Sequence, residues 1–551
     1  MRRLLNFFLL LLPGMLVIAC GGGEPSTEPA EAPAQAATQS DTTLGTGLSA
    51  IAAEGIEKHL RFLADDARQG RMTGSPEYDA AAAYVAEQFA SMGLEPGGED
   101  DGWFQAVPLL SRTLAEDSAT LVFHQDGQAN AQRFKEDFVM GGDYVRPKTE
   151  VTAEVVFAGF GVHAPELGYS DYDGIDVDGK IVALFGGAPA TFPHNERAYY
   201  SSSLAKSEEA VSRGAIGLIS LRSRVDQQRY SWKRITQFAT GQPGMTWINL
   251  SGRAANYFPE LRGGAIVNVP SAEDLFSRSP ISFEDALDAA DAGTPMSTPL
   301  GVEATLARET EHESISSPNV VGILRGSDPD LADEYVVFTA HLDHVGVGEA
   351  VNGDTIYNGM YDNAMGSSIL IETARAFVSM PEAPKRSIIF IALTGEERGL
   401  IGSDYFAHYP TVPSGSMVAN INLDMPLFLY PLADMIAFGA EHSSLGPVVE
   451  AAIAEEGFAL LPDPMPQETI FIRSDQYSFV RQGVPAVFLV AGYTSSDPEI
   501  NGQAVWQGFL QKHYHQPDDD LNQPVHWPSA ERFTRANVRI GYAVAEEAQR
   551  P

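Results

Sequence analysis

Cysteine and basic residues are scarce in this sequence. Its 551 residues include a single cysteine, Cys20, so no disulfide can form within the chain. Lys and Arg number 36 against 73 Asp and Glu, and the formal net charge is −37. Such an excess of acid excludes nucleic acid as an expected partner, because phosphates repel it. An acidic surface is otherwise typical of solubility and indicates no particular activity.

Two common hydrolase motifs are also missing. The sequence contains no G-x-S-x-G and no H-E-x-x-H, which argues against a serine-hydrolase elbow and against a zincin helix. It has no internal repeat and no second candidate membrane segment after the N-terminal apolar run. At this length the chain is too long for one core and predicts two or three domains.

The N-terminus reads as a targeting segment. Residues 1–19 hold two arginines followed by an apolar stretch too short for an ordinary membrane span. The run V-I-A-C that ends at Cys20 resembles a bacterial lipoprotein signal, which implies acylation of Cys20, membrane contact through the lipid and export to the cell envelope. A plain secretory signal is the alternative. Gly21 is not acidic, which favours the outer membrane, and residues 20–45 are predicted to be a flexible tether.

A globular region begins after the tether. We assign residues 46–145 to the first part of a catalytic domain and predict a helix over 77–91, with Ser75 as its N-cap and an apolar face. Arg71 and Thr73, just before this helix, are expected to be solvated loop residues.

Short β-runs follow and indicate an inserted domain at 146–270. Apolar strands are expected at 154–162, 178–187 and 214–221. The segment resembles a protease-associated domain through the run FAGFGVHAPELGYSDYDGIDVDGKIVALFGGAP and the helix after it. That resemblance implies a domain that shapes substrate access without chemistry of its own. Residues 271–304 are expected to be the return linker to the catalytic domain.

The second half, residues 305–551, alternates strands with helices. This pattern predicts an α/β fold: a mostly parallel, mixed sheet with helices on both faces, from which the small β-rich insert projects. The expected strands are 335–340, 387–393, 417–423 and 485–490, and the expected helices are 363–379, 443–456 and 529–547.

Acids and an imidazole recur where these strands end. They are His341 and Asp343, then Glu396 and Glu397, then Asp424, while Asp362 opens a helix. The carboxyl ends of parallel strands form one crevice, so these side chains should converge. Carboxylates gathered without a basic residue repel one another unless a cation is bound, so the sequence predicts a metal site.

The individual roles are less certain from the residues alone. Asp343 is expected to orient the second ring nitrogen of His341, and Asp362 taken by itself could be a plain N-cap. The pattern does not order Glu396 and Glu397. A further imidazole ligand is expected from His515, with His513 as its competitor. The remaining candidates are expected to be surface or packing residues: His344, His408, His442 and His526.

Together the motifs H-x-D, D-N, G-E-E, N-x-D-M and Y-H-x-x-x-D resemble peptidase family M28, the co-catalytic zinc aminopeptidases and carboxypeptidases. The intervals fit as well: 21 residues from His341 to Asp362, 35 to Glu397 and 27 to Asp424. The resemblance implies two zinc ions, bridged by Asp362, with Glu396 as general base. It implies the ligand set His341, Asp362, Glu397, Asp424 and His515.

The same resemblance has finer implications. Tyr514 matches a tyrosine that donates to the oxyanion in some members, although it could simply be a packing residue. The peptide bond between Asp362 and Asn363 is expected to be cis. Gln476 departs from the family pattern, in which His is common at this position, and the substitution concerns the surroundings of the site and not its ligands.

Peptides are the expected substrates, and N-terminal cleavage is favoured. An aminopeptidase holds a free ammonium, whereas a carboxypeptidase or dipeptidase needs a fixed cation for a carboxylate. Few bases accompany the ligand segments: Arg398, Arg473 and Lys512, and Arg473 could pair with Asp475. A non-catalytic, receptor-like module is the third alternative, against which the complete ligand set argues. The sequence indicates no oligomeric state.

Overall fold

The computed structural model describes residues 34–551, so the predicted signal and Cys20 lie outside it. Of the predicted tether, residues 34–45 belong to helix α1 (Ala34–Ala50), so this part is helical and not irregular chain. In the second half of this helix Leu48 is buried, and Gly47 lies so close to Met380 that a Cβ would clash. Among the described residues no helix has the length and apolar character needed to cross a membrane.

The first sheet has four adjacent parallel strands at its centre, in the order β17, β14, β18 and β21. Their bounds are Ser387–Leu393, Tyr335–His341, Met417–Asn422 and Ala486–Ala491, close to the predicted runs. Antiparallel strands flank them, namely β13 (Ser297–Leu324) on β17 and β19 (Asp434–Phe438) on β21. The sheet is completed by β1 (Glu95–Pro96), β2 (Phe104–Leu114), β11 (Gly244–Trp247) and β20 (Ala459–Leu461). The predicted mostly parallel, mixed sheet is confirmed.

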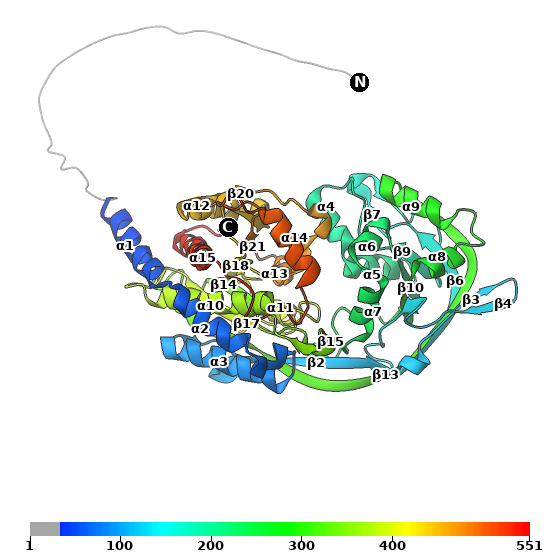
Figure 1. Cartoon of the computed structure of the whole chain (residues 1–551), viewed down its shortest axis with the longest axis horizontal. Coiled ribbons are helices and arrows are strands. Elements are labelled where there is room, and N and C mark those ends of the chain that lie inside the picture. Colours follow the sequence, from blue (N-terminus) through cyan, green and yellow to red (C-terminus); the bar gives the residue numbers. More distant parts are fainter. Residues whose placement is uncertain (1–33) are drawn as a thin grey trace, which may run out of the picture. The chain divides into compact units, whose positions relative to one another are not determined.

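Helices cover both faces of this sheet (Figure 1). Side chains alternate along a strand, so Phe338 and Phe390 pack in the larger core, while Val337 and Ile389 point into a smaller core on the opposite face. The larger core includes α2 (Ala53–Leu63), α3 (Pro76–Met92), α10 (Met365–Val378), α12 (Leu445–Glu455) and α15 (Trp527–Glu546). The larger core also includes α14 (Gly502–Lys512), through Trp506 and Phe509, whereas the smaller core includes α11 (Ile401–His408) and α13 (Gln476–Arg481).

Helix α3 matches the prediction for 77–91. The Ser75 hydroxyl accepts a hydrogen bond from the Tyr78 amide at 3.1 Å, and Gly93 ends the helix with a φ of 84°. Its predicted apolar face, which includes Val85 and Phe89, is fully buried.

A second sheet holds the predicted insert. The expected strands correspond to β6 (Lys148–Ala158), β9 (Ile181–Phe185) and β10 (Gly217–Leu221). The sheet also includes β3 (Thr120–Gln125), β4 (Gln128–Ala131), β5 (Phe138–Val139) and β12 (Gly263–Val267). It therefore starts before residue 146. Its helices include α4 (His194–Ser201), α5 (Ser203–Ser212), α6 (Arg224–Arg229) and α7 (Trp232–Thr240).

The range predicted as a return linker is ordered secondary structure. It holds α8 (Val269–Leu275), α9 (Phe283–Ala292) and the start of β13. Leu275, Phe283 and Leu287 are buried in the core of the second sheet, which explains why this segment is not a loose connection. Strand β13 pairs with β6 and β3 and then, further along, with β2 and β17, so one strand joins both sheets (Figure 1).

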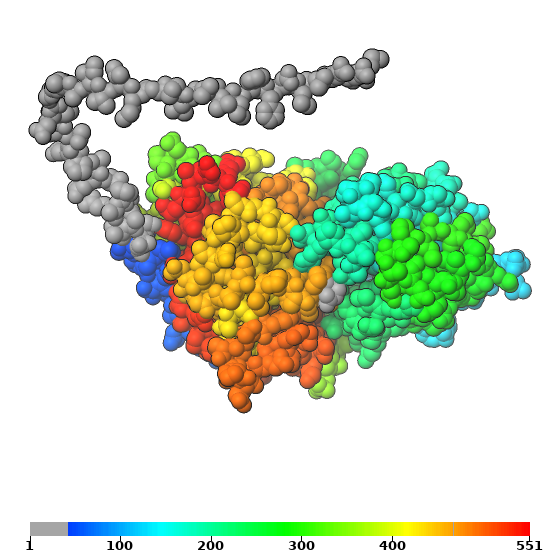
Figure 2. All heavy atoms as spheres, turned by 90° about the horizontal axis from the view of Figure 1, so that it is seen from above, coloured from blue at the N-terminus to red at the C-terminus, as the bar shows by residue number. Residues whose placement is uncertain are grey.

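Within residues 43–551, which form one compact unit, the region of the second sheet contacts the later part of the chain. His194 lies 2.8 Å from Asp463, and Arg229 forms an ion pair with Glu468. The space-filling view shows this contact as cyan and green residues against gold and orange ones (Figure 2).

Candidate metal centre

The predicted acids meet at the carboxyl ends of the parallel strands. His341 is the last residue of β14, the turn after β17 carries Glu396 and Glu397, and Asp424 follows β18. Because β17, β14 and β18 are adjacent and parallel, their ends lie at one edge of the sheet.

A first cluster consists of His341, Asp362 and Asp424, all buried. His341 Nε2 lies 3.1 Å from Asp424 Oδ1 and 3.3 Å from Asp362 Oδ1. The other oxygen of Asp424 accepts a 2.5 Å hydrogen bond from the Ser474 hydroxyl, which fixes the carboxylate in this orientation.

A second cluster consists of His344, Asp362, Glu397 and His515. His515 Nε2 lies 3.1 Å from both Asp362 Oδ2 and Glu397 Oε2, and His344 Nδ1 lies 2.7 Å from Glu397 Oε1. His513 instead contacts Asp518 at 2.9 Å, so His515 is the imidazole that reaches the site. The prediction of His344 as a surface or packing residue is wrong, because its fully buried ring belongs to this cluster.

Asp362 belongs to both clusters, and its position is set by the turn before α10. The turn Met360–Ala364 contains the cis peptide bond between Asp362 and Asn363 that was predicted. Asp519 accepts hydrogen bonds from the amides of Tyr361 and Asp362 at 3.0 and 3.1 Å. One Asp362 oxygen therefore faces His341 and the other faces His515.

Asp343 supports the glutamate turn and not the imidazole of His341. The Nδ1 atom of His341 is 3.1 Å from the main-chain oxygen of Asp343 but 3.9 Å from its carboxylate. That carboxylate accepts hydrogen bonds from the Thr73 hydroxyl at 2.9 Å and from the amides of Glu396 and Glu397 at 3.1 and 3.4 Å. The expectation that the Asp343 side chain orients His341 is therefore corrected.

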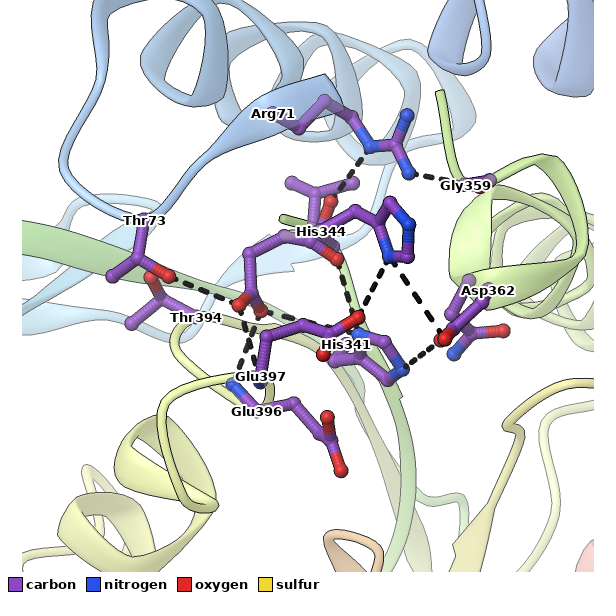
Figure 3. Close-up of polar contacts among 12 residues, drawn as sticks. Arg71, Thr73, His341, His344, Gly359, Asp362, Thr394, Glu396 and Glu397 are labelled. Carbon is purple, nitrogen blue, oxygen red and sulfur yellow. Dashed lines mark hydrogen bonds and ion pairs between the residues drawn. The ribbon is translucent and has the colours of Figure 1, made fainter. Parts of the chain in front are cut away.

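Arg71 and Thr73 are not solvated loop residues. Both are buried, with Arg71 0% exposed, and Figure 3 shows Arg71 beside the loop at Gly359. Its guanidinium donates to the carbonyl oxygens of Leu342 at 2.8 Å, Leu63 at 2.6 Å, Asn358 at 2.7 Å and Gly359 at 3.1 Å. Arg71 thus ties the loop after β14 to the turn that carries Asp362.

The segment around Gln476 lies behind Asp424. Gln476 accepts a hydrogen bond from Asn422 at 3.0 Å and donates to the Phe471 carbonyl at 2.6 Å, so in place of the expected His it connects β18 to the next turn. Arg473 approaches Glu468 at 3.7 Å, so the pairing expected with Asp475 is not formed.

The electrostatics of both clusters favour added positive charge. Burial would lower the pKa of His515, but the carboxylates of Glu397 and Asp362 outweigh it and raise that pKa to about 9. Burial, together with Asp424 and Glu397, raises the pKa of Glu396 well above its usual range, despite the opposing effect of His341. Bound protons thus compensate the negative charge of the clustered carboxylates, and a divalent cation would compensate it in the same way.

Unsatisfied ring nitrogens also indicate that the clusters are suited to bind a cation. His344 Nδ1 and His515 Nε2 lie 2.7 to 3.1 Å from carboxylate oxygens, yet no ring nitrogen of either residue, nor Glu397 Oε1, has a hydrogen bond of good geometry among the described residues. These imidazole nitrogens and carboxylate oxygens point toward one place without forming hydrogen bonds to one another, and such nitrogen and oxygen donors are ligands that zinc prefers. The residues therefore fit a metal site.

A cavity of about 580 Å³ opens beside these clusters. Asp362, Glu396 and Asp424 line it together with Tyr514, and most of the remaining wall is apolar. The ring of Tyr514 packs on that of His515 with centroids 3.9 Å apart. None of the described residues forms a hydrogen bond with the Glu396 carboxylate, which faces the cavity unengaged.

Comparison with known proteins agrees with this geometry. A family model described as peptidase family M28 matches residues 319–540. This region is a peptidase family M28 domain. Similar proteins include a probable leucine aminopeptidase 2 from Aspergillus oryzae, 26% identical over 48% of this chain and 51% of that one, and aminopeptidase YwaD from Bacillus subtilis, 28% identical over 42% and 45%. The chain spans about half the length, or less, of the curated relatives it matches.

The fold of the M28 domain and its insert is also known. An aminopeptidase from Aneurinibacillus sp. strain AM-1 superposes with a TM-score of 0.53 at 18% identity, covering 92% of this chain and 97% of that one. At this identity the match establishes the fold.

Sequence reasoning overlooked three groups that contact the ligands of the M28 domain. His344 carried no signal beyond its place three residues after His341. Asp519 was visible as the last residue of Y-H-x-x-x-D but had no assigned role. Ser474 precedes Asp475 in a segment that was read only for Gln476.

Proposed function

We propose that this protein is a zinc aminopeptidase whose M28 domain binds two zinc ions. The observation that carries the proposal is Asp362, whose two oxygens are divided between two clusters of buried donors. A carboxylate in this position suits two neighbouring cations, as co-catalytic sites require. His341 and Asp424 would hold one ion, and Glu397 and His515 the other.

His344 adds an imidazole on the side of Glu397, at 2.7 Å. It would either contribute a ligand or fix the orientation of Glu397. Zinc supplies Lewis acidity, which polarises a peptide carbonyl and makes a water molecule more acidic.

The remaining chemistry belongs to side chains of this chain. Glu396 is the proposed general base, since its carboxylate lines the cavity and forms no hydrogen bond among the described residues. Its amide is held by Asp343, which sets its place beside the ligands. Tyr514 lines the same cavity, from which its hydroxyl is available to a developing oxyanion.

Two features support cleavage from the N-terminus. The relatives quoted above are named aminopeptidases, and two of the three arginines that line the cavity are engaged by an acid. Arg229 and Arg473 both pair with Glu468, whereas Arg234 has no ion pair among the described residues. The carboxypeptidase or dipeptidase alternative would need one of them, or another cation, to meet a carboxylate.

Blocked peptides test the polarity. An N-acetylated peptide should not be cleaved, whereas a C-terminally amidated one should retain turnover, and a chelator should abolish cleavage of both. Cleavage of the N-acetylated peptide together with rejection of the amidated one would reverse the assignment to a carboxypeptidase. Absence of any cleavage by zinc-loaded protein would favour a binding module.

The cellular setting is part of the same proposal. Acylation of Cys20 would place the enzyme at the cell envelope in contact with a membrane, and the region of the second sheet would act as a protease-associated domain that shapes access. The ion pair between Arg229 and Glu468 at the cavity supports this role for the second region.

A further inference from the structure

A second cavity, of about 680 Å³, borders the candidate metal centre and is lined by three arginines. Arg112 comes from β2, Arg308 from β13 and Arg398 from the residue after Glu397, which also lines the cavity. The arginines thus reach one space from three separate elements. No part of the proposed chemistry uses them.

Several guanidinium nitrogens in this cavity lack an acceptor. The Nε atoms of all three arginines, and one terminal nitrogen of Arg398, are buried without a hydrogen-bond partner among the described residues. Arg398 has no ion pair within this part of the chain, while Arg308 approaches Asp143 at 3.4 Å. The cavity acid Glu116 is engaged by Lys135 at 2.7 Å. Positive charge therefore exceeds the free acid available to it.

The backbone around Arg112 leaves room for the cluster. Its guanidinium lies 3.6 Å from the centre of the Tyr144 ring, which holds it flat. A Cβ at Gly244 would come within 2.6 Å of Arg112 Nε. Burial lowers the pKa of Arg308 and of Arg398, so both guanidiniums are held where solvent compensates them poorly.

A third cavity, of about 550 Å³, lies beside the arginine cavity and the metal centre and is lined by residues of both. This third cavity shares Arg398 with the arginine cavity and Glu396 with the apolar one. All three cavities therefore adjoin the metal clusters, and the arginine cavity does so on the side of Glu397.

We propose that Arg112, Arg308 and Arg398 bind a substrate carboxylate on the leaving-group side of the cleaved bond. Guanidinium groups pair with carboxylates through two parallel hydrogen bonds, and the three arginines that line this cavity are the groups that would supply them. The inference rests on the proposed function and adds to it a preference for short peptides that end close to the cleavage site. The carboxylate belongs to the C-terminus or to an acidic side chain.

Three peptides distinguish a C-terminal carboxylate from a side-chain carboxylate as the bound group: Leu-Gly-Gly, its C-terminal amide, and the amide of Leu-Gly-Glu. The free peptide should show a KM about ten-fold to a hundred-fold below that of its amide, with similar kcat. Recovery of the low KM by the glutamate-containing amide would assign the site to an acidic side chain. Equal KM values for all three peptides would overturn the proposal.

The variants Arg398→Gln and Arg112→Gln should remove the preference and leave the KM for the amide unchanged. The Arg398 side chain forms no hydrogen bond among the described residues, so its replacement costs the fold little. The matched control is Arg278→Gln, which removes one positive charge from a side chain that is 61% exposed and pairs with Asp126. A loss of preference in the control would show a general charge effect and contradict the proposal.

Calorimetric titration of the zinc-loaded Glu396→Gln variant with Gly-Gly and its amide tests the site without turnover. The Glu396→Gln protein should bind Gly-Gly at least ten-fold more tightly than the amide, and the double variant Glu396→Gln/Arg398→Gln should bind both alike. If the protein cleaves no peptide but shows this difference, the proposed function fails and the carboxylate site stands. If it cleaves peptides but shows no difference, only the carboxylate site fails.

Discussion

Replacing Arg71 with leucine should destabilise the fold and also weaken zinc binding. The Arg71 side chain is fully buried and donates to four carbonyl oxygens, which leucine would leave without donors. An unsatisfied buried acceptor costs about 1 kcal/mol at the low end of the usual range, so we expect a loss of about 4 kcal/mol. The folded protein should therefore melt at a lower temperature.

The loss of zinc affinity follows from where those carbonyls lie. Leu342 stands between His341 and Asp343, and Gly359 precedes the turn that carries Asp362. Without the guanidinium both loops gain freedom, and removal of such supporting contacts typically lowers metal affinity about 10-fold to 100-fold. Competition with a chelating dye would measure this change.

Arg386→Leu is the matched control. Arg386 is equally buried, donates to the carbonyl oxygen of Val544 at 2.9 Å and pairs with Glu334 at 2.7 Å, at the opposite end of β17 from the glutamate turn. It should lower the melting temperature without changing zinc affinity. Equal zinc affinity in the two variants, or an Arg71→Leu protein as stable as the wild type, would refute the reasoning.

Further predictions concern the acids, a buried lysine and the N-terminus. Glu396→Gln should keep its zinc and lose about 10²- to 10⁴-fold in kcat. Asp362→Asn should lose zinc, as measured by elemental analysis. Loss of zinc from Glu396→Gln would contradict the role of Glu396 as base. Burial lowers the pKa of Lys206 to about 7, so above that pH the unfolded chain binds more protons than the folded one and the stability of the wild type rises with pH. Lys206→Met removes this dependence. Its gain in melting temperature over the wild type should therefore be largest near pH 7 and shrink toward pH 10. Cys20→Ser should abolish membrane partitioning of the full chain, and unchanged partitioning would exclude the lipid anchor.

The central strands and most of the ligands were readable from the sequence because the signals are local. Each buried strand is a mainly apolar run, and a polar residue at or just after its end marks the edge of the sheet, as with His341 and Asp424. The capping residues of α3 are likewise adjacent in sequence to the helix they cap. Such signals need no knowledge of distant contacts.

Other features depend on residues far apart in the chain. The burial of Arg71 results from carbonyls about 270 to 290 residues away, so nothing beside it distinguished it from a solvated loop residue. Likewise, β13 joins two sheets because its halves pair with strands from different regions, and no local pattern marks that division. Helices α8 and α9 were predicted to be a linker, because their burial depends on packing against the core of the second sheet, which the local sequence does not show.

By itself, the sequence determined that the chain is an α/β protein with carboxylates and imidazoles at adjoining strand ends, because strand runs and their termini are encoded locally. Only the tertiary structure decided that His515 and not His513 reaches the site, that His344 joins it, and that Asp343 holds the glutamate turn. These choices depend on the direction in which each side chain leaves the backbone and on the element packed opposite. The folded chain as a whole sets both.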